Sequence, residues 1–281
     1  MPFATHRALR YVTPLREGGS LPALVETDGG LFVTKFRGAG QGARALLAEL
    51  IVGGIADALG LPIPEVALVE APPAFGHAEP DPEIQDILKG SVGLNVGLGY
   101  VEGAFPYDAL AAADVVPADL AAEVVWLDAL TTNIDRTARN PNLLVAAEAS
   151  GEAMLWLIDH GAALYFHHNW ESVDEARARA PFAPIKDHVL LAASGDIADA
   201  DARLAPRLTP EVVAAVLAAV PDALFMDAPE GRTAPFATPE ANRDAYARFF
   251  RQRLGGPRAW VHEAVRARAA HASGEALPYR R

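Results

Sequence analysis

Residues 1–71 contain short runs in which apolar and polar positions alternate, and turn-forming residues separate these runs. A period of two over four to eight residues is typical of β-strands. The step Asp28-Gly29-Gly30 lies between two such runs and indicates a hairpin turn. We expect strands at residues 9–15, 22–27, 31–36 and 65–71.

A helical period interrupts these strands. Leucine and isoleucine recur three or four residues apart within residues 43–59, which predicts a helix there. Gly60 and Pro62 follow, and this order is typical of a helix end because proline cannot continue the helix. Residues 72–108 are rich in proline, glycine and acidic residues, so we expect them to form a connector or hinge region.

From about Asp114 onward, most apolar positions follow the helical period. Two shorter apolar runs, residues 143–147 and 154–160, are instead typical of strands. The pattern as a whole predicts an α+β chain in which residues 1–71 are β-rich and residues 109–281 form a larger, mostly helical part. Helices are expected at residues 118–131, at residues 209–225, and as a pair within residues 239–270 that Gly255-Gly256-Pro257 separates.

Composition narrows the class of protein. The chain has 281 residues, a formal net charge of −12 and no cysteine. The lack of cysteine excludes disulfides, thiol catalysis and cysteine-bound zinc, and the negative charge disfavours nonspecific binding to duplex DNA or anionic membranes. No stretch reaches the roughly 18 apolar residues of a membrane span, and the N-terminus lacks the apolar core of a secretory signal. We therefore expect a soluble cytoplasmic protein with no membrane span and no nucleic-acid partner.

The most specific segment is a polar loop between a predicted helix and a predicted strand. Its sequence, TTNIDRTARNPNLLV, presents Asp135, Arg136, Asn140 and Asn142, and the next strand leads to Asp159. Phosphoryl transfer uses one carboxylate to orient the acceptor hydroxyl, and a second carboxylate with an amide oxygen to hold Mg²⁺. Asparagine and aspartate are also common in turns and helix caps, but two acidic sites at consecutive strand edges favour the functional interpretation.

The β-rich part supplies groups of complementary charge. Lys35 lies late in a predicted strand, and Glu49 lies on a face of small residues in the following helix. Kinases hold a strand lysine against the nucleotide phosphates with a helix glutamate in this way, although both residues would also suit an ordinary solvated surface. Gly18, Gly19 and Ser20 lie between two predicted strands, as a kinase glycine-rich loop does.

In order along the chain, these segments resemble the HipA-like kinases, and the Asp-Arg…Asn loop is also similar to that of the phosphatidylinositol-kinase branch of the same superfamily. The resemblance covers about residues 16–161. It implies a two-lobed protein-kinase-like fold, with a small β-rich N-lobe, a larger helical C-lobe, and ATP and Mg²⁺ in the cleft. By position, Lys35 would contact the ATP phosphates and Asp135 would be the catalytic aspartate. Asp159 of Asp-His-Gly would replace the metal-binding aspartate of the usual Asp-Phe-Gly.

Two residues qualify as the metal-binding asparagine. Asn140 has the five-residue spacing from Asp135 that is usual in kinases, whereas Asn142 directly precedes the strand, as the kinase asparagine also does. We expect Asn142 to bind the metal, because ladder hydrogen bonds hold a residue at a strand end more rigidly than one in mid-loop. Thr137 stands where many protein kinases carry a lysine, which weakens the inference of a protein substrate.

These residues together predict a phosphotransferase that uses ATP and Mg²⁺ and acts on a hydroxyl of an acceptor that the sequence does not identify. Arg136 or Arg139 would neutralise charge on the transferred group. A nucleotide-binding pseudokinase and an adenylyl transferase on the same fold stay open as alternatives. A metal-dependent hydrolase is less favoured: the adjacent pair His167-His168 lacks the helical spacing of zinc ligands.

Overall fold

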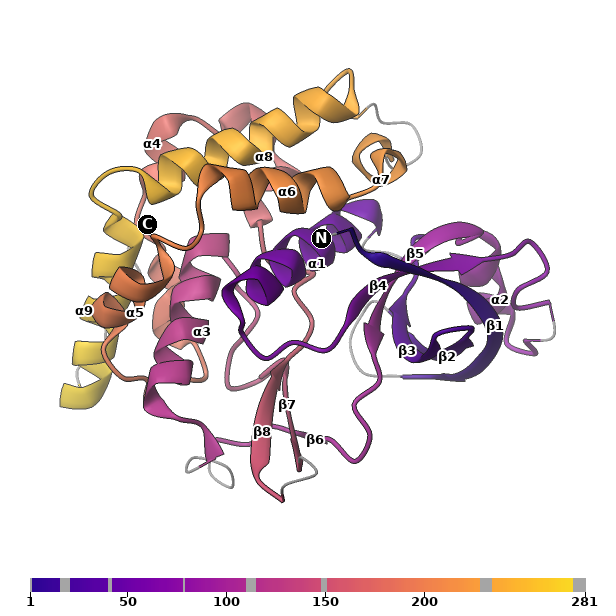
Figure 1. Ribbon diagram of the computed structural model, residues 1–281, viewed down its shortest axis with the longest axis horizontal. Helices are drawn as coiled ribbons and strands as arrows, with labels where there is room; N and C mark the ends of the chain where they lie inside the picture. Colours follow the sequence, from indigo (N-terminus) through magenta and orange to yellow (C-terminus); the bar gives the residue numbers. More distant parts are fainter. Residues whose placement is uncertain are drawn as a thin grey trace.

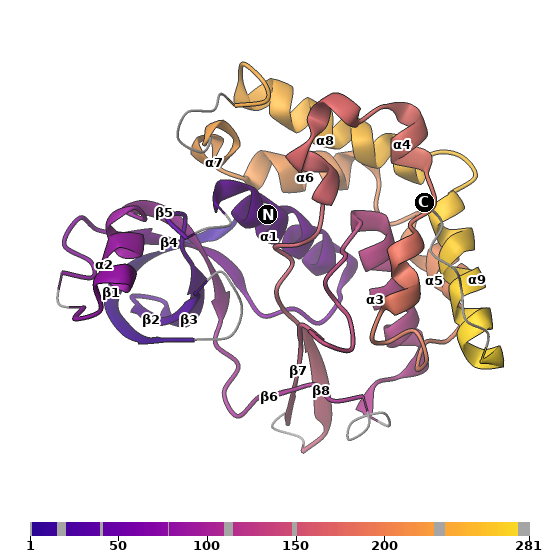
Figure 2. The ribbon, with the colours of Figure 1, turned by 180° about the vertical axis from the view of Figure 1, so that it is seen from behind.

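In the computed structural model, the strands of the N-terminal part gather at one end of the molecule and most helices gather at the other (Figures 1 and 2). The structure describes residues 2–15, 21–39, 42–77, 79–109, 115–147, 151–227 and 234–274. Within these ranges, no helix combines the length and the apolar character needed to cross a bilayer.

Five strands close into a barrel in the order β1-β2-β3-β5-β4. Strands β1 and β4 pair in parallel, and the other neighbours pair antiparallel. Alternate side chains of the strands fill the barrel, so that Val25 and Phe32 are almost completely buried. All four runs that were predicted as strands contribute to it. The strands are β1 (Ala4–Pro14), β2 (Ala23–Thr27), β3 (Gly30–Lys35), β4 (Val66–Ala71) and β5 (Gly93–Gly99).

The prediction that residues 72–108 form a connector or hinge region needs correction, because part of this segment belongs to the barrel. Residues 72–108 contain helix α2 (Pro82–Lys89) and the barrel strand β5, which pairs with both β3 and β4. The glycines of β5 suggested a loop, but one of them is required by packing. A Cβ atom on Gly97 would lie 2.7 Å from a methyl group of Val69 and 3.1 Å from the Phe32 side chain. Glycine in a strand thus marks a close approach here and not a turn.

Helix α1 (Gly42–Leu59) follows the barrel strand that ends at Lys35 and confirms the predicted helix. It is buried on almost every side, because it lies between the barrel and the C-terminal helices (Figure 1). Two adjacent glycines allow this close fit: a Cβ atom on Gly53 would lie 2.9 Å from Val66, and one on Gly54 would lie 2.8 Å from Val216.

The C-terminal part is built around α3 (Ala118–Thr131), which confirms a predicted helix. Its Trp126 ring packs edge-on against Trp260, with ring centroids 5.4 Å apart. The predicted break at Gly255-Gly256-Pro257 is also present. The remaining helices are α4 (Glu175–Arg179), α5 (Ile197–Leu204), α6 (Pro210–Ala219), α7 (Asp222–Met226), α8 (Pro239–Leu254) and α9 (Ala259–Ser273), with short 3-10 turns at Tyr165–His168, Trp170–Ser172 and Ala183–Asp187.

One predicted helix is wrong in its length. Residues 209–225 form α6 and α7, with a break at Val220 and Pro221. Val220 is extended, with ψ 128°, because proline disfavours helical geometry in the residue before it.

A small second sheet places the polar loop. It consists of β6 (Phe105–Pro106), β7 (Leu143–Ala147) and β8 (Ala153–Leu157) in that order. Leu143 lies opposite Leu157, so the first residue of β7 and the last residue of β8 are neighbours. The strand expected at residues 154–160 therefore ends early, and Asp159 lies in the loop that follows it.

Candidate active site

Three segments that are distant in sequence meet at the amine of Lys35. Lys35 is the last residue of β3, Glu49 lies in the middle of α1, and Asp159 follows β8. The Lys35 Nζ atom donates to Glu49 Oε1, and it also donates to Asp159 Oδ1 at 2.6 Å. Lys35 and Glu49 are 6% and 1% exposed, so neither is a solvated surface residue. The predicted Lys35–Glu49 ion pair is present.

The three charges shift one another's pKa values. Burial alone would lower the pKa of Lys35, but the two nearby carboxylates outweigh it and the pKa is raised. For Glu49 burial acts in the other direction and raises the pKa, and Lys35 offsets only part of that effect. For Asp159, burial is outweighed by Lys35, and the pKa is lowered. Two carboxylates thus share one ammonium group, which favours a further cation beside Asp159, the more exposed of the two.

Gly161 allows the Asp-His-Gly loop to approach α1. A Cβ atom at this position would lie 3.1 Å from Glu49 Oε1 and 3.5 Å from the Ala45 methyl group. The Gly161 N–H also donates to Asp159 Oδ1 at 3.3 Å. The face of small residues on α1 therefore receives this loop. Asp57, the other carboxylate on that face, is exposed and does not take the place of Glu49.

The polar loop closes on itself around Asp135. Thr137 and Asn140 exchange backbone hydrogen bonds at 3.1 Å, which makes a tight turn. The side-chain amides of Asn140 and Asn142 both donate to Asp135 Oδ2, at 2.7 Å and 3.2 Å. The Asp135 N–H donates to the side-chain oxygen of Asn133 at 3.1 Å. Both candidate asparagines are thus brought to the candidate catalytic carboxylate.

Asn142 and Asp159 come from adjacent backbones. The Ile158 N–H donates to the carbonyl of Asn142 at 3.1 Å. Asn142 and Asp159 both have left-handed backbone geometry, with φ of 50° and 53°. A carboxylate and an amide oxygen are suitable Mg²⁺ ligands, and Asn142 turns its amide nitrogen toward Asp135, so its oxygen is the atom left for a cation. The residues present therefore fit a magnesium site.

Arg136 is not placed to neutralise charge on a transferred group, which is the role that the sequence predicted for it. It is 1% exposed, and its Nε donates to Asp128 Oδ2 at 2.5 Å. One terminal nitrogen donates to the carbonyls of Asn142 and Ile158, and the other lies 3.2 Å from His160 Nδ1. A side chain held in this way supports the backbone and does not reach a transferred group. Arg139 is exposed on the turn.

His160 explains why this chain has Asp-His-Gly. The ring is completely buried, and burial, together with the neighbouring Arg136 charge, lowers the pKa of His160 to about 3. A neutral ring can accept the Arg136 N–H at Nδ1, which a phenylalanine could not do.

His167 and His168 lie together in a 3-10 turn, and the His167 ring bonds the Tyr246 hydroxyl at 2.9 Å. In the part of the chain that the structure describes, no three His, Asp or Glu side chains are grouped to hold a metal ion.

Asp128, Asn133 and His188 contribute to the site and were missed in the sequence. The Asp128 carboxylate accepts from Arg136, from Asn133 Nδ2 at 3.0 Å and from His188 Nε2 at 2.8 Å. An acidic residue within the apolar run VVWLDAL was the available signal, because a charge on the buried face of a helix needs a partner. Gly18, Gly19 and Ser20 lie outside the described residues.

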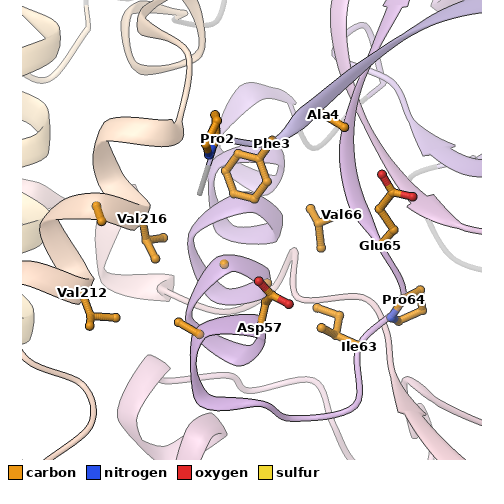
Figure 3. A pocket seen from close by; sticks show the side chains of 14 residues that line it. Pro2, Phe3, Ala4, Asp57, Ile63, Pro64, Glu65, Val66, Val212 and Val216 are labelled. Atoms are coloured by element: carbon orange, nitrogen blue, oxygen red, sulfur yellow. The ribbon is translucent and has the colours of Figure 1, made fainter. Parts of the chain in front are cut away.

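A groove of about 710 Å³ lies on α1 away from these groups (Figure 3). Phe3, Ile63, Val66 and Val216 line it with apolar side chains, and Asp57 lies at its side. It lacks the lysine and the asparagines that a phosphate and a metal would require, so the candidate site is the Lys35 cluster.

Both the sequence and the fold have counterparts among known proteins. The family described as HipA-like kinase matches residues 12–191. The crystal structure of a Helicobacter pylori proinflammatory kinase, CtkA, has a similar fold, with a TM-score of 0.52 and 12% identity over 96% of this chain and 99% of that chain. No curated protein matches the sequence. The structural likeness concerns the fold alone, whereas the family match spans more than half of the sequence, and on that ground this chain belongs to the HipA-like kinase family.

Proposed function

We propose that this protein is a two-lobed kinase that transfers the γ-phosphate of ATP to a hydroxyl group and requires Mg²⁺. The barrel and α1 would form the N-lobe, and the nucleotide would bind between it and the helical C-lobe. The observation that carries the proposal is the Lys35 amine, which bonds the carboxylates of both Glu49 and Asp159. Kinases use a lysine, a glutamate and an aspartate of this kind to hold the phosphates and the metal.

The burial of each side chain indicates its role in binding the nucleotide and the metal. Lys35 would contact the phosphates while the buried Glu49 keeps the amine in place. Asp159 is partly exposed, so nucleotide binding would break its bond to Lys35 and leave the bond to Glu49 intact. Asp159 would then hold Mg²⁺ together with the side-chain oxygen of Asn142 or Asn140. When bound, Mg²⁺ would neutralise charge on the phosphates.

Asp135 would orient the acceptor hydroxyl and accept its proton. The two asparagine amides at its Oδ2 atom fix the orientation of this half-buried carboxylate. Arg139 is the candidate for neutralising charge on the transferred group, because Arg136 is buried.

The melting temperature tests nucleotide binding. Mg·ATP should raise it, because a ligand that binds only the folded chain stabilises that state. Asp135→Asn should keep this shift and abolish transfer, since Asp135 acts on the acceptor. Asp159→Gly should lose most of the shift, since it removes a metal ligand while glycine tolerates the left-handed backbone at this position. A folded protein that shows no shift at millimolar Mg·ATP would contradict the proposal, and equal loss of binding in both variants would contradict the division of roles.

The product identifies the reaction. Turnover of ATP with a panel of metabolites and proteins should give an acceptor that gains the mass of a phosphate. A gain of the mass of AMP would indicate an adenylyl transferase instead. Mg·ATP binding without any product, with Asp135→Asn indistinguishable from the wild type, would indicate a pseudokinase.

A further inference from the structure

A single buried carboxylate lies behind both halves of the candidate site. Asp128 is on α3, is completely buried, and is surrounded on its helix by apolar residues. A charge in such a place is stable only when it is paired and hydrogen-bonded. Burial by itself would raise the pKa of Asp128, but Arg136 outweighs it and holds the pKa well below its usual range.

The two oxygens of this carboxylate serve different segments. Oδ1 accepts from Asn133, whose own side-chain oxygen accepts the N–H of Asp135. Oδ2 accepts from Arg136, whose guanidinium donates to the carbonyls of Asn142 and Ile158. One oxygen therefore leads to the residue proposed to orient the acceptor. The other leads to the ends of β7 and β8, beside which Asn142 and Asp159, the residues proposed to bind the metal, are located.

The strand ends depend on this support. Asn142 and Asp159 both have the left-handed backbone that glycine adopts most readily. Asparagine and aspartate tolerate this geometry better than other non-glycine residues, but it is sparsely populated, so contacts with the surroundings stabilise it. The Arg136 guanidinium bonds the carbonyl of Asn142 itself and that of Ile158, the residue before Asp159, so it holds the backbone at both places.

A later segment completes the arrangement. His188 Nδ1 accepts the Leu190 N–H at 3.1 Å, so its Nε2 atom carries the hydrogen and donates to Asp128. The next residue, Val189, donates its N–H to the carbonyl of Arg136 at 3.1 Å. The segment around His188 thus holds the side chain of Asp128 and the backbone of Arg136 at the same time.

We propose that Asp128 is a positioning residue that sets the acceptor loop and the metal-binding strand ends relative to each other, with His188 as its support. This inference rests on the proposed function. It predicts a specific defect: loss of the Asp128 charge should weaken the use of Mg²⁺ even though Asp128 touches neither metal nor nucleotide.

Asp128→Asn tests this role, because it preserves the size of the side chain and removes its charge. The readout is the Mg²⁺ concentration that gives half of the ATP-dependent rise in melting temperature. We expect this concentration to increase about 10- to 100-fold, the usual effect of removing a residue that supports metal ligands. An increase no larger than that of the control variant would overturn the proposal.

Asp201→Asn is the matched control. Asp201 is a mostly buried aspartate of the helical part that accepts from Trp126 Nε1 at 2.8 Å and pairs with Arg258 at 2.6 Å. Its substitution also breaks a structural ion pair next to α3, but its partners Trp126 and Arg258 are not among the groups that bond the Asp128 carboxylate. It should lower the melting temperature and leave the Mg²⁺ requirement unchanged. If Asp128→Asn does not fold, His188→Gln replaces it, with a smaller change in the same direction expected.

Hydrogen exchange separates this inference from the proposed function, because it needs no nucleotide. Asp128→Asn should speed exchange of the Asp135 and Ile158 amides relative to Asp201→Asn. Asn133→Ala should speed exchange at Asp135 alone, since it interrupts only one of the two connections. Unchanged exchange at both amides in Asp128→Asn would overturn the positioning role. A wild-type protein that shows no Mg·ATP shift would instead contradict the proposed function.

Discussion

Asn140 and Asn142 share a hydrogen-bond partner but differ in how their backbones are held. Asn140 is exposed and closes the turn with Thr137. Asn142 is 9% exposed, directly precedes β7, and has its carbonyl bonded by Arg136 and by the Ile158 N–H. A metal ligand needs a rigid backbone, so these contacts favour Asn142 over the residue with the usual kinase spacing.

Substitution of each asparagine should therefore give a different defect. Asn142→Gly should raise the Mg²⁺ requirement of ATP binding about tenfold or more, because it removes the amide. Glycine is preferable to alanine here, since it tolerates the left-handed backbone. Asn140→Ala should leave that requirement unchanged and lower the free energy of unfolding by about 1 kcal/mol, the usual contribution of one hydrogen bond. Magnesium titrations and denaturant unfolding of both variants measure this. The opposite pattern would assign the metal to Asn140.

At the scale of elements, glycines determine how closely strands and helices approach. In β5 the flanking side chains leave no room for a methyl group at Gly97, whereas at Gly99 the nearest atom, Glu65 Cβ, lies at an ordinary distance of 3.4 Å. The same principle applies to Gly53 and Gly54 of α1 and to Gly161 beside Glu49. These glycines bring the barrel, the helix and the Asp-His-Gly loop within reach of one another.

Gly97→Ala should thus destabilise the barrel by about 1–3 kcal/mol, the typical effect of overpacking a filled interior. Gly99→Ala on the same strand is the control, and it should change the free energy of unfolding much less. Denaturant unfolding of the two variants measures the difference. Equal stabilities would mean that Val69 and Phe32 can move aside, and that β5 does not depend on this contact.

At the scale of the whole molecule, burial keeps several histidines neutral. Burial lowers the pKa of His160, of His167 and of His188, and in His188 the bond to Asp128 offsets only part of this effect. In the unfolded chain a histidine has a pKa near 6.5, so below that pH the unfolded state binds protons that the folded state does not. Stability should therefore fall as pH falls below 6.5. Glu49 acts in the opposite sense, because its pKa is raised in the folded protein.

His167→Gln tests this linkage away from the candidate site. The free energy of unfolding of the wild type should decrease between about pH 6.5 and pH 4.5, and each buried histidine contributes at most about 1.4 kcal/mol per pH unit. Glutamine does not titrate, so the slope of the variant should be shallower by about that amount. Tyr246→Phe removes the hydroxyl partner of His167 and keeps the histidine, so it should lower stability without changing the slope. An unchanged slope in His167→Gln would show that this histidine is protonated in the folded state.

Predictions from the sequence succeeded where a property is local. Hydrophobic periodicity located α1 and α3, and glycine and proline located the break between α8 and α9. The lysine, the glutamate and the acidic loop could be assigned to definite elements, because a side chain's place on a strand or helix follows from its spacing. The Lys35–Glu49 pair could be predicted because kinases pair a strand lysine with a helix glutamate, and Glu49 lies on a face of small residues.

The tertiary structure decided what depends on neighbours that are distant along the chain. The glycine-rich strand β5 resembles a loop until its packing against Val69 and Phe32 is seen. Arg136 resembles a catalytic residue until Asp128, His160 and the carbonyl of Asn142 take up its N–H groups. Spacing in the sequence determines which residues share a helix or a strand. The burial and the hydrogen-bond partners of a side chain depend on the other elements that pack against its own. This burial and these partners determine whether a charged side chain faces a ligand or supports the backbone.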